Sequence, residues 1–367
     1  MFNENSLQDW VLAVLSSKIS LTADRVNLIL SFYPTLSESI LDNFSKLKKT
    51  ENKWLNRFQS SFNLEKETLE FKTKLEKSEI QFITIFSPNF PKKLQILQKV
   101  PVVLFYEGDL KLLETNSWIT VVGARNSSLY AENLMKLILE PCCISGLGVV
   151  SGLAMGVDKI SHETALKMGS KTIGVIGSGL DKDCFYPSQN WLLKNQIVKG
   201  GGLVLSEYGP GSVATVYNFP ARNRILAAIS ELTWVVQAGL KSGSLITAEA
   251  ARDLSKTVAT TPGSILDKSL LGNLELIKNG ASLISSPEDI FQLLGLKTHP
   301  EILPRPKPVF DNSLEENVYN SLDLNAINIE KIATKLNLKI TDLASILSLL
   351  ELRGYVQNSG QNEWLRN

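Results

Sequence analysis

The sequence has few of the residues that hold metals or form disulfides. Among its 367 residues are three cysteines and two histidines. Cys142 and Cys143 are adjacent and Cys184 stands alone, so the spacing predicts reduced thiols rather than a disulfide framework. No Cys/His spacing typical of zinc sites occurs. We therefore expect neither a metal site nor a fold held by disulfides.

An excess of charge of one sign is also missing. Lys+Arg number 38 and Asp+Glu 37, so any site for a polyanion must be a local patch rather than a whole-molecule field. No uninterrupted apolar run is long enough to cross a bilayer, and residues 1–5 lack the basic and apolar segments of a signal peptide. These absences predict a cytoplasmic protein with no membrane partner.

The length of the chain exceeds what one typical core accommodates, and its composition changes along the sequence. Ser6–Asp9 and Thr35–Glu38 read as capping boxes of short helices. We predict a small helical domain of the SAM or helix-hairpin-helix type over residues 1–78. A Rossmann-like domain over 79–297, a proline-rich linker over 298–312 and a winged-helix domain over 313–367 follow.

From about residue 80 onward, short apolar runs alternate with helical patterns. This alternation is typical of α/β proteins with a doubly wound parallel sheet. The predicted strands cover residues 82–86, 102–106, 118–122, 148–151, 171–176, 202–206, 232–236 and 257–260. The predicted helices between them cover residues 130–139, 159–168, 189–199 and 245–254. Ser286, Pro287 and Asp289 supply the N-cap, the N1 proline and an acidic first turn for one more helix.

The C-terminal residues show three helical patterns, at 314–322, 329–336 and 341–353, and then a possible hairpin over 355–364. This order is typical of a winged helix. Residues 313–367 hold five Lys/Arg and seven Asp/Glu, whereas a helix that reads a DNA groove needs a basic face. Direct DNA contact by this module is therefore the less favoured interpretation.

Small and polar residues follow four of the predicted strands, in the segments 123–128, 152–158, 177–182 and 241–244. The carboxyl ends of parallel strands lie along one edge of a sheet, and ligands bind there. The N–H groups at the helix starts that follow such loops favour anions. The four segments together therefore predict an anion site at this edge.

Two later segments add cations and hydroxyl groups. Residues 219–224 read FPARNR, which places Arg222 and Arg224 at the opening of a predicted helix. Residues 241–248 read KSGSLITA, a small-residue loop that leads into another helix. Guanidinium groups and hydroxyls bind phosphate well, and neither segment offers a nucleophile with a base. The pattern predicts binding rather than cleavage.

Two common nucleotide fingerprints are absent. The chain has no G-x-G-x-x-G at the end of a strand and no G-x-x-x-x-G-K-[ST]. A dinucleotide or an ATP held by a P-loop is therefore excluded, and we expect no cofactor. A nucleic-acid strand or a mononucleotide remains as the anion.

Five ordered motifs carry a family resemblance. They lie at residues 121–125, 151–158, 179–187, 219–224 and 241–248. Together they resemble the DNA-processing protein A family, also called DprA or Smf, from about residue 80 to 291. The resemblance implies a homodimer that binds single-stranded DNA during bacterial natural transformation, protects it and loads the RecA recombinase on it. It implies no catalytic residue.

The residues expected to contact DNA combine the motifs of the resemblance with the phosphate-binding groups above. They are Gly123, Arg125, Ser127, Lys182, Phe219, Arg222, Asn223, Arg224, Lys241, Ser242, Gly243, Ser244 and Thr247. Phe219 is the preferred residue for base stacking, with Tyr186 and Tyr217 as alternatives.

The chain departs from the family pattern at several positions. Met155 stands where the family usually has arginine, Ala124 where it has serine, and Gln237 where it has glutamate. The first two changes remove a cation and a hydroxyl and so predict a weaker affinity for DNA than is typical. The alternative function is that of a phosphoribohydrolase, acting on nucleoside monophosphates, of the same α/β superfamily. When the loops are aligned on Thr247, Ala250 takes the place of its glutamate, so the acid/base group of that reaction is missing.

Overall fold

A computed structural model of the chain describes residues 6–18, 21–32, 63–115, 118–296, 310–323, 326–360 and 362–366. The chain divides into two units, Met1–His299 and Pro300–Asn367. Most of the predicted linker, residues 298–309, and the predicted capping box at 35–38 lie outside the described residues. The boundaries of the four predicted segments stay predictions.

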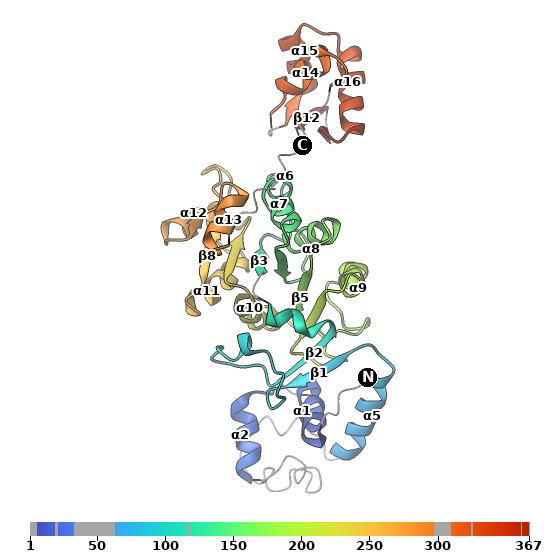
Figure 1. Cartoon of the computed structure of the whole chain (residues 1–367), viewed down its shortest axis with the longest axis vertical. Helices are drawn as coiled ribbons and strands as arrows, with labels where there is room; N and C mark the ends of the chain where they lie inside the picture. Colours follow the sequence, from blue (N-terminus) through green and yellow to red (C-terminus); the bar gives the residue numbers. More distant parts are fainter. Residues whose placement is uncertain are drawn as a thin grey trace. The chain divides into compact units, whose positions relative to one another are not determined.

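Within the described residues, the first unit is built on a nine-stranded sheet (Figure 1). The strands are β1 (Gln81–Thr84), β2 (Val103–Gly108), β3 (Trp118–Val122), β4 (Gly148–Ser151), β5 (Thr172–Ile176), β6 (Leu203–Ser206), β7 (Leu232–Val235), β8 (Thr257–Thr260) and β9 (Ser282–Leu283). Their spatial order is β1-β2-β6-β5-β4-β3-β7-β8-β9. The seven strands β3 to β9 are mutually parallel, whereas β1 and β2 form an antiparallel extension at the β6 edge. The predicted doubly wound α/β fold is confirmed.

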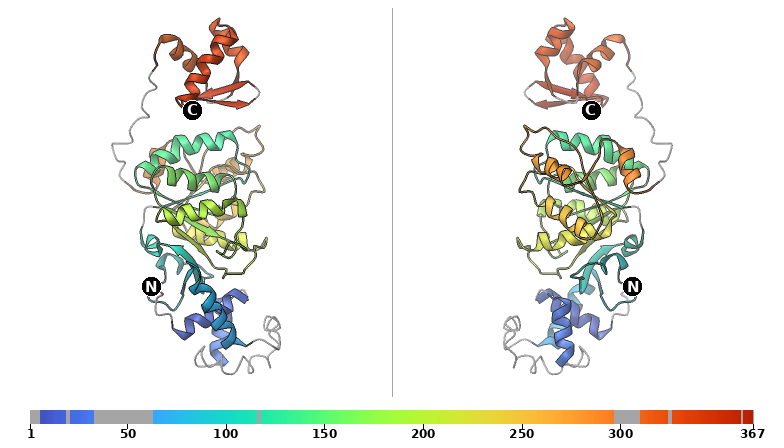
Figure 2. Two further views of the ribbon diagram at one scale, coloured as in Figure 1. Left: turned by 90° about the vertical axis from the view of Figure 1, so that its right-hand side faces the viewer. Right: turned by 90° about the vertical axis from the view of Figure 1, so that its left-hand side faces the viewer.

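Helices cover both faces of the sheet (Figures 1 and 2). The helices α8 (Val157–Lys167) and α9 (Trp191–Lys199) lie on one side, and α10 (Asn218–Ile229), α11 (Ser244–Asp253) and α12 (Leu271–Lys278) on the other. The chain adds β4, β5 and β6 on one side of β3 and then β7, β8 and β9 on the other. Because the crossovers are right-handed, the helices of these two halves cover opposite faces of the sheet. The reversal falls between β3 and β7, which is where the carboxyl ends of an open sheet leave a crevice.

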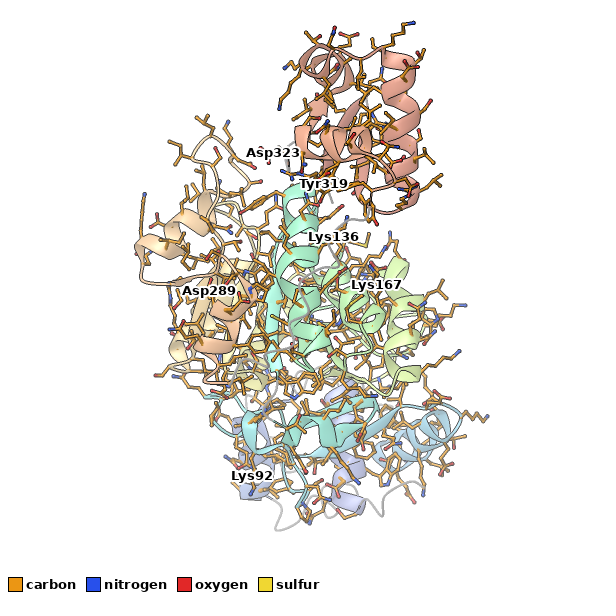
Figure 3. All side chains as sticks on the ribbon, turned by 45° about the horizontal axis from the view of Figure 1, so that its top comes forward. Lys92, Lys136, Lys167, Asp289, Tyr319 and Asp323 are labelled. Carbon is orange, nitrogen blue, oxygen red and sulfur yellow. The ribbon has the colours of Figure 1, made fainter. Side chains whose placement is uncertain are left out.

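The helix predicted over residues 130–139 is longer and less regular than expected. It consists of α6 (Leu129–Leu134), a π-helical segment (Met135–Leu139) and α7 (Glu140–Ile144). Pro141 has no N–H to donate and its ring crowds the carbonyl four residues earlier, so the wider π turn before it accommodates the proline. Figure 3 shows Lys136 on this segment and Lys167 at the end of α8; the ammonium of Lys167 pairs with Glu140 at 3.2 Å.

The described N-terminal helices share a core with the sheet. They are α1 (Leu7–Lys18), α2 (Ala23–Phe32) and α5 (Leu64–Glu76). Leu12 and Leu15 are fully buried in one apolar cluster with Phe105 of β2 and Val204 of β6. Burial of this apolar surface fixes the helices against the antiparallel extension. Within the described ranges, no helix has both the length and the apolar character needed to cross a bilayer.

The predicted capping box at Ser6–Asp9 has the expected hydrogen bonds, and the N-cap predicted at Ser286 forms a capping box with Asp289. Ser6 N donates to Asp9 Oδ2 at 2.9 Å, and Asp9 N donates to Ser6 Oγ at 3.3 Å. At the start of α13 (Pro287–Leu293), Asp289 accepts from the N–H groups of Ser285 and Ser286 at 2.7 and 2.9 Å (labelled in Figure 3). These hydrogen bonds lower the pKa of Asp289.

The second unit has three helices and, among its described residues, a three-stranded antiparallel sheet of order β10-β12-β11. Its elements are α14 (Ser313–Ser321), β10 (Ile327–Asn328), α15 (Ile329–Leu336), α16 (Ile340–Leu352), β11 (Val356–Gly360) and β12 (Glu363–Arg366). Leu343, Leu347 and Trp364 pack in one buried cluster. The element order is the one predicted, and the assignment as a winged helix stays a prediction.

Candidate nucleic-acid interface

A cleft of about 730 Å³ opens at the carboxyl ends of β3 and β7, at the reversal of strand order. Ten of the thirteen residues predicted to contact DNA line it. They are Gly123, Arg125, Phe219, Arg222, Asn223, Lys241, Ser242, Gly243, Ser244 and Thr247. The structure therefore brings together segments that are more than a hundred residues apart in the sequence.

Two cations of the cleft are available to a ligand. Arg125 and Lys241 are exposed, and neither has an ion-pair partner among the described residues. The Arg125 guanidinium lies 5.3 Å from the centroid of the Phe219 ring, which holds it by a cation–π contact. Cations that no carboxylate of the protein neutralises attract phosphate groups.

The loop before α11 offers small polar groups beside these cations. The hydroxyl oxygens of Ser242 and Ser244 are 2.8 Å apart. A Cβ built on Gly243 meets no atom within 4 Å, so the backbone there is open to a ligand. Asn223 supports the loop from α10, because its Nδ2 donates to the Gly243 carbonyl at 3.3 Å. A helix start with accessible backbone suits an anion.

Arg222 lies at the base of the cleft and is largely buried. Its Nη1 donates to the carbonyls of Gly152, at 2.7 Å, and Val175, and its Nε donates to Asn223 Oδ1 at 3.1 Å. No described residue accepts a hydrogen bond from its Nη2. Burial lowers the pKa of Arg222 to about 10, which leaves it charged at neutral pH.

Asp158 is the buried counter-charge of Arg222. A Cβ on Gly152 would lie 2.5 Å from Arg222 Nη2 and 2.6 Å from Asp158 Oδ2, so only glycine fits between these groups. Burial raises the pKa of Asp158, and Arg222 opposes that shift. The N–H groups of Gly152 and Ala154 donate to Asp158 Oδ2 at 3.1 and 3.4 Å. Asp158 thus fixes the loop after β4.

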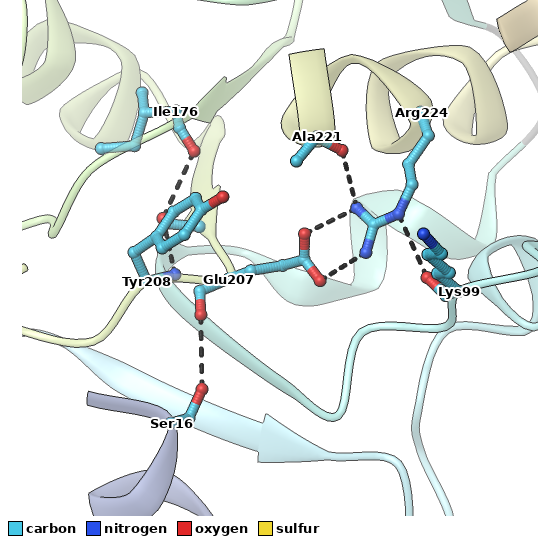
Figure 4. A network of polar contacts seen from close by, with 8 residues as sticks. Ser16, Lys99, Ile176, Glu207, Tyr208, Ala221 and Arg224 are labelled. Atoms are coloured by element: carbon cyan, nitrogen blue, oxygen red, sulfur yellow. Dashed lines mark hydrogen bonds and ion pairs between the residues drawn. The ribbon is translucent and has the colours of Figure 1, made fainter. Parts of the chain in front are cut away.

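Arg224 occupies a different place from the one predicted. Its guanidinium forms two hydrogen bonds of 2.6 Å with the Glu207 carboxylate and donates to the carbonyls of Lys99 and Ala221, at 3.1 and 2.9 Å (Figure 4). It does not appear among the described residues that line the cleft. Residues two positions apart point to nearly opposite sides of a helix, since each residue turns the chain by about 100°, so Arg222 and Arg224 have different surroundings.

Two further predicted residues lie outside the cleft lining. Ser127 directs its hydroxyl to Glu132 Oε1 at 3.4 Å, in the first turn of α6. Lys182 is exposed on the loop after β5 and does not belong to the described residues lining the cleft. Neither side chain joins the group formed by Arg125, Arg222 and Lys241.

Three further residues, none of them among those predicted to contact DNA, support or line the cleft. Asn190 donates from Nδ2 to the carbonyls of Leu153 and Ala154, at 2.9 and 3.0 Å, and so holds the loop after β4. Gln237 accepts from Ser128 N at 2.9 Å and donates to Ser269 Oγ at 2.8 Å. Val216 lines the cleft from the irregular loop before α10. Their partners lie far away in sequence, so spacing alone does not identify them.

The cleft has little to offer an acid/base reaction. Among its described lining residues, Asp158 is the one carboxylate, and its Oδ2 already accepts two backbone hydrogen bonds. His162 is fully buried, its Nδ1 lies 2.7 Å from Thr172 Oγ1, and burial lowers its pKa to about 3. Met155 lines an adjoining pocket with Arg125 and Phe219.

The chain is similar to proteins of one known family. The family model for DNA recombination-mediator protein A matches residues 81–295, more than half of the chain. The DNA processing protein DprA of Bacillus subtilis is 39% identical over 215 residues, which cover 59% of this chain and 71% of the relative. The DNA processing protein DprA of Streptococcus pneumoniae is 42% identical over 207 residues, which cover 56% and 72%.

Two solved structures agree with these relatives. The X-ray structure of DNA processing protein A from Streptococcus pneumoniae has a TM-score of 0.63 at 32% identity and covers 82% of this chain and 100% of its own. DNA processing protein A from Helicobacter pylori, described by its single-stranded DNA binding mode, has a TM-score of 0.52 at 32% identity and covers 58% and 95%. The predicted resemblance is confirmed, and the matching family is named for mediating DNA recombination. The chain belongs to the DNA recombination-mediator protein A family.

Proposed function

We propose that this chain binds single-stranded DNA in the cleft at the carboxyl ends of β3 and β7. The observation that carries the proposal is the pair of exposed cations, Arg125 and Lys241, which line the cleft together with the small residues 242–244 and have no carboxylate partner among the described residues. The binding mode named for the Helicobacter pylori relative supports the choice of ligand. Phosphate contacts of this kind give binding that is independent of sequence and falls with salt.

Within the cell, we propose that the protein receives incoming single strands during natural transformation, protects them and loads RecA on them as a cytoplasmic homodimer. Family membership and the DNA-processing names of its relatives support this role. RecA loading is checked by the rate at which RecA filaments form on oligo-dT coated with a single-strand binding protein. A rate unchanged by this protein contradicts the loading step. Light scattering measures the molecular mass in solution, and the mass of a single chain contradicts the dimer.

DNA binding is tested by fluorescence anisotropy of a labelled oligo-dT and of a duplex of equal length. The variant is Arg125→Ala/Lys241→Ala. The matched control, Lys199→Ala/Lys278→Ala, removes two exposed charges from the last turns of α9 and α12, at the opposite end of the strands. We expect oligo-dT binding to weaken at least tenfold in the first variant and to stay near wild type in the control. Equal affinities in all three proteins would contradict the proposed site.

A further inference from the structure

The loop between β6 and α10 ends in an apolar segment that the fold leaves uncovered. Val213, Val216 and Tyr217 have exposed fractions of 71, 74 and 83%. We call these three residues the apolar lip. Exposed apolar residues gathered in one short segment mark an interaction site more often than exposed residues scattered singly. The exposure of the apolar lip therefore indicates a surface that binds a ligand.

The lip adjoins the phosphate-binding cleft. Val216 is itself a lining residue of the cleft, together with Phe219 and Pro220 at the start of α10. The Tyr217 backbone is fixed, because its carbonyl accepts from Ala221 N at 3.4 Å. Its hydroxyl, by contrast, has no hydrogen-bond partner among the residues that the structure describes. The side chain is thus positioned by the helix start and left free for contact.

Two aromatic residues line the cleft, Phe219 and Tyr186, and both already have protein partners. Their rings lie 5.6 Å apart, and the Arg125 guanidinium lies 5.3 Å from the centroid of the half-buried Phe219 ring. These contacts use the ring to hold Arg125 in place. Tyr217, two residues before Phe219, is more exposed than Tyr186, at 83% against 46%, and has no ring partner among the described residues.

We propose that the apolar lip is the surface on which unpaired bases pack when their phosphates bind Arg125 and Lys241, and that it gives the protein its preference for single strands. This inference rests on the proposed function. A single strand carries phosphates and uncovered flat bases together, which matches cations beside an apolar lip. In a duplex the bases are stacked inside and do not reach such a surface. Base–aromatic stacking is tolerant of sequence.

The size of the lip favours bases over a second protein. A stable protein interface needs roughly 800 Å² from each partner, far more than three side chains of one loop provide. Tyrosine and valine side chains suffice for one or two bases, and continuity with the cleft supplies the phosphate contact. The lip therefore matches a ligand that the cleft already holds.

The test compares Tyr217→Ser, Tyr217→Phe and Val216→Ser with Ile144→Ser, a control that changes an exposed side chain at the end of α7. Anisotropy is measured with oligo-dT, with an abasic strand of the same length, and with a duplex. We expect Tyr217→Ser to weaken oligo-dT binding about tenfold and Val216→Ser to weaken it less. Binding of the abasic strand and of the duplex should not change, and Tyr217→Phe should keep wild-type affinity.

The outcomes separate the lip from the proposed function. If wild type does not bind oligo-dT, the proposed function fails. If wild type binds oligo-dT and Tyr217→Ser binds it equally well, the lip inference fails while the cleft stands. An equal loss on the abasic strand overturns base contact, because no base is present there. A change of molecular mass of Tyr217→Ser in light scattering would assign the lip to an interface between copies and overturn the inference.

Discussion

The cations near the cleft differ in how far the protein itself has neutralised them. Arg125 and Lys241 have no carboxylate partner among the described residues, whereas Arg224 is held by Glu207. Arg222 is intermediate, because it donates to backbone carbonyls and lies beside the buried Asp158. At the scale of residues, Arg125 and Lys241 are therefore the cations that we propose to bind the ligand, and we expect Arg222 to contribute both to the cleft and to stability.

Replacing Arg222 should lower the free energy of unfolding of the protein. Arg222→Met leaves the Asp158 carboxylate buried without its positive neighbour, and removal of one partner of such a pair costs about 3 kcal/mol. Urea denaturation measures the loss. The variant Arg222→Met/Asp158→Asn should recover part of it, and Arg125→Ala should unfold within about 0.5 kcal/mol of wild type. Equal stability of Arg222→Met and wild type would contradict this account.

His162 should make the protein sensitive to mild acid. Burial lowers its folded-state pKa to about 3, whereas an unfolded histidine titrates near 6.5. Between these values the unfolded state binds the extra proton, so stability falls as the pH drops, by about 2 kcal/mol at pH 5. His162→Gln should lose less stability than wild type between pH 7 and pH 5 in urea denaturation. The same pH dependence in both proteins would rule out this histidine as the cause.

At the scale of elements, a buried ion pair joins α9 to the antiparallel extension. Lys194 bonds to Glu107 of β2, with side chains 2 and 8% exposed, and its ammonium lies 4.6 Å from the Trp191 ring centroid. Burial raises the pKa of Glu107, and Lys194 opposes that shift. We expect Lys194→Met to cost about 3 kcal/mol, and Lys194→Met/Glu107→Leu to cost less, because no buried charge then remains unpaired. Urea denaturation measures the free energy of unfolding of both variants. A double variant less stable than the single one would contradict this prediction.

The elements that the sequence predicts correctly are those with a local signal. The runs that became β3 to β8 are buried along nearly their whole length, so they read as continuous apolar segments. The antiparallel direction of β1 and β2 has no such signal, and β9 is two residues long. The ion pair of Arg224 with Glu207 depends on residues that meet only in the fold. Sequence motifs thus identify most of the residues that line the cleft. Which arginines are exposed, buried or paired with a carboxylate is known only from the structure.

At the scale of the whole molecule, the two units differ in charge. The cleft and its cations belong to the first unit, whereas residues 313–367 hold five Lys/Arg and seven Asp/Glu. We expect removal of residues 310–367 to leave oligo-dT affinity within about twofold, since the phosphate contacts remain. Anisotropy of the shortened chain checks this. A loss of tenfold or more would assign DNA contacts to the second unit.

The most direct test of the central claim is the salt dependence of oligo-dT binding. Each phosphate contact to a single strand contributes about 0.7 to the slope of log affinity against log salt. Wild type and Arg125→Ala/Lys241→Ala are titrated over the same range of salt. The proposed cleft predicts that the variant's slope is smaller by about 1.4, two contacts' worth. An unchanged slope would show that these two cations do not bind phosphate and would contradict the account.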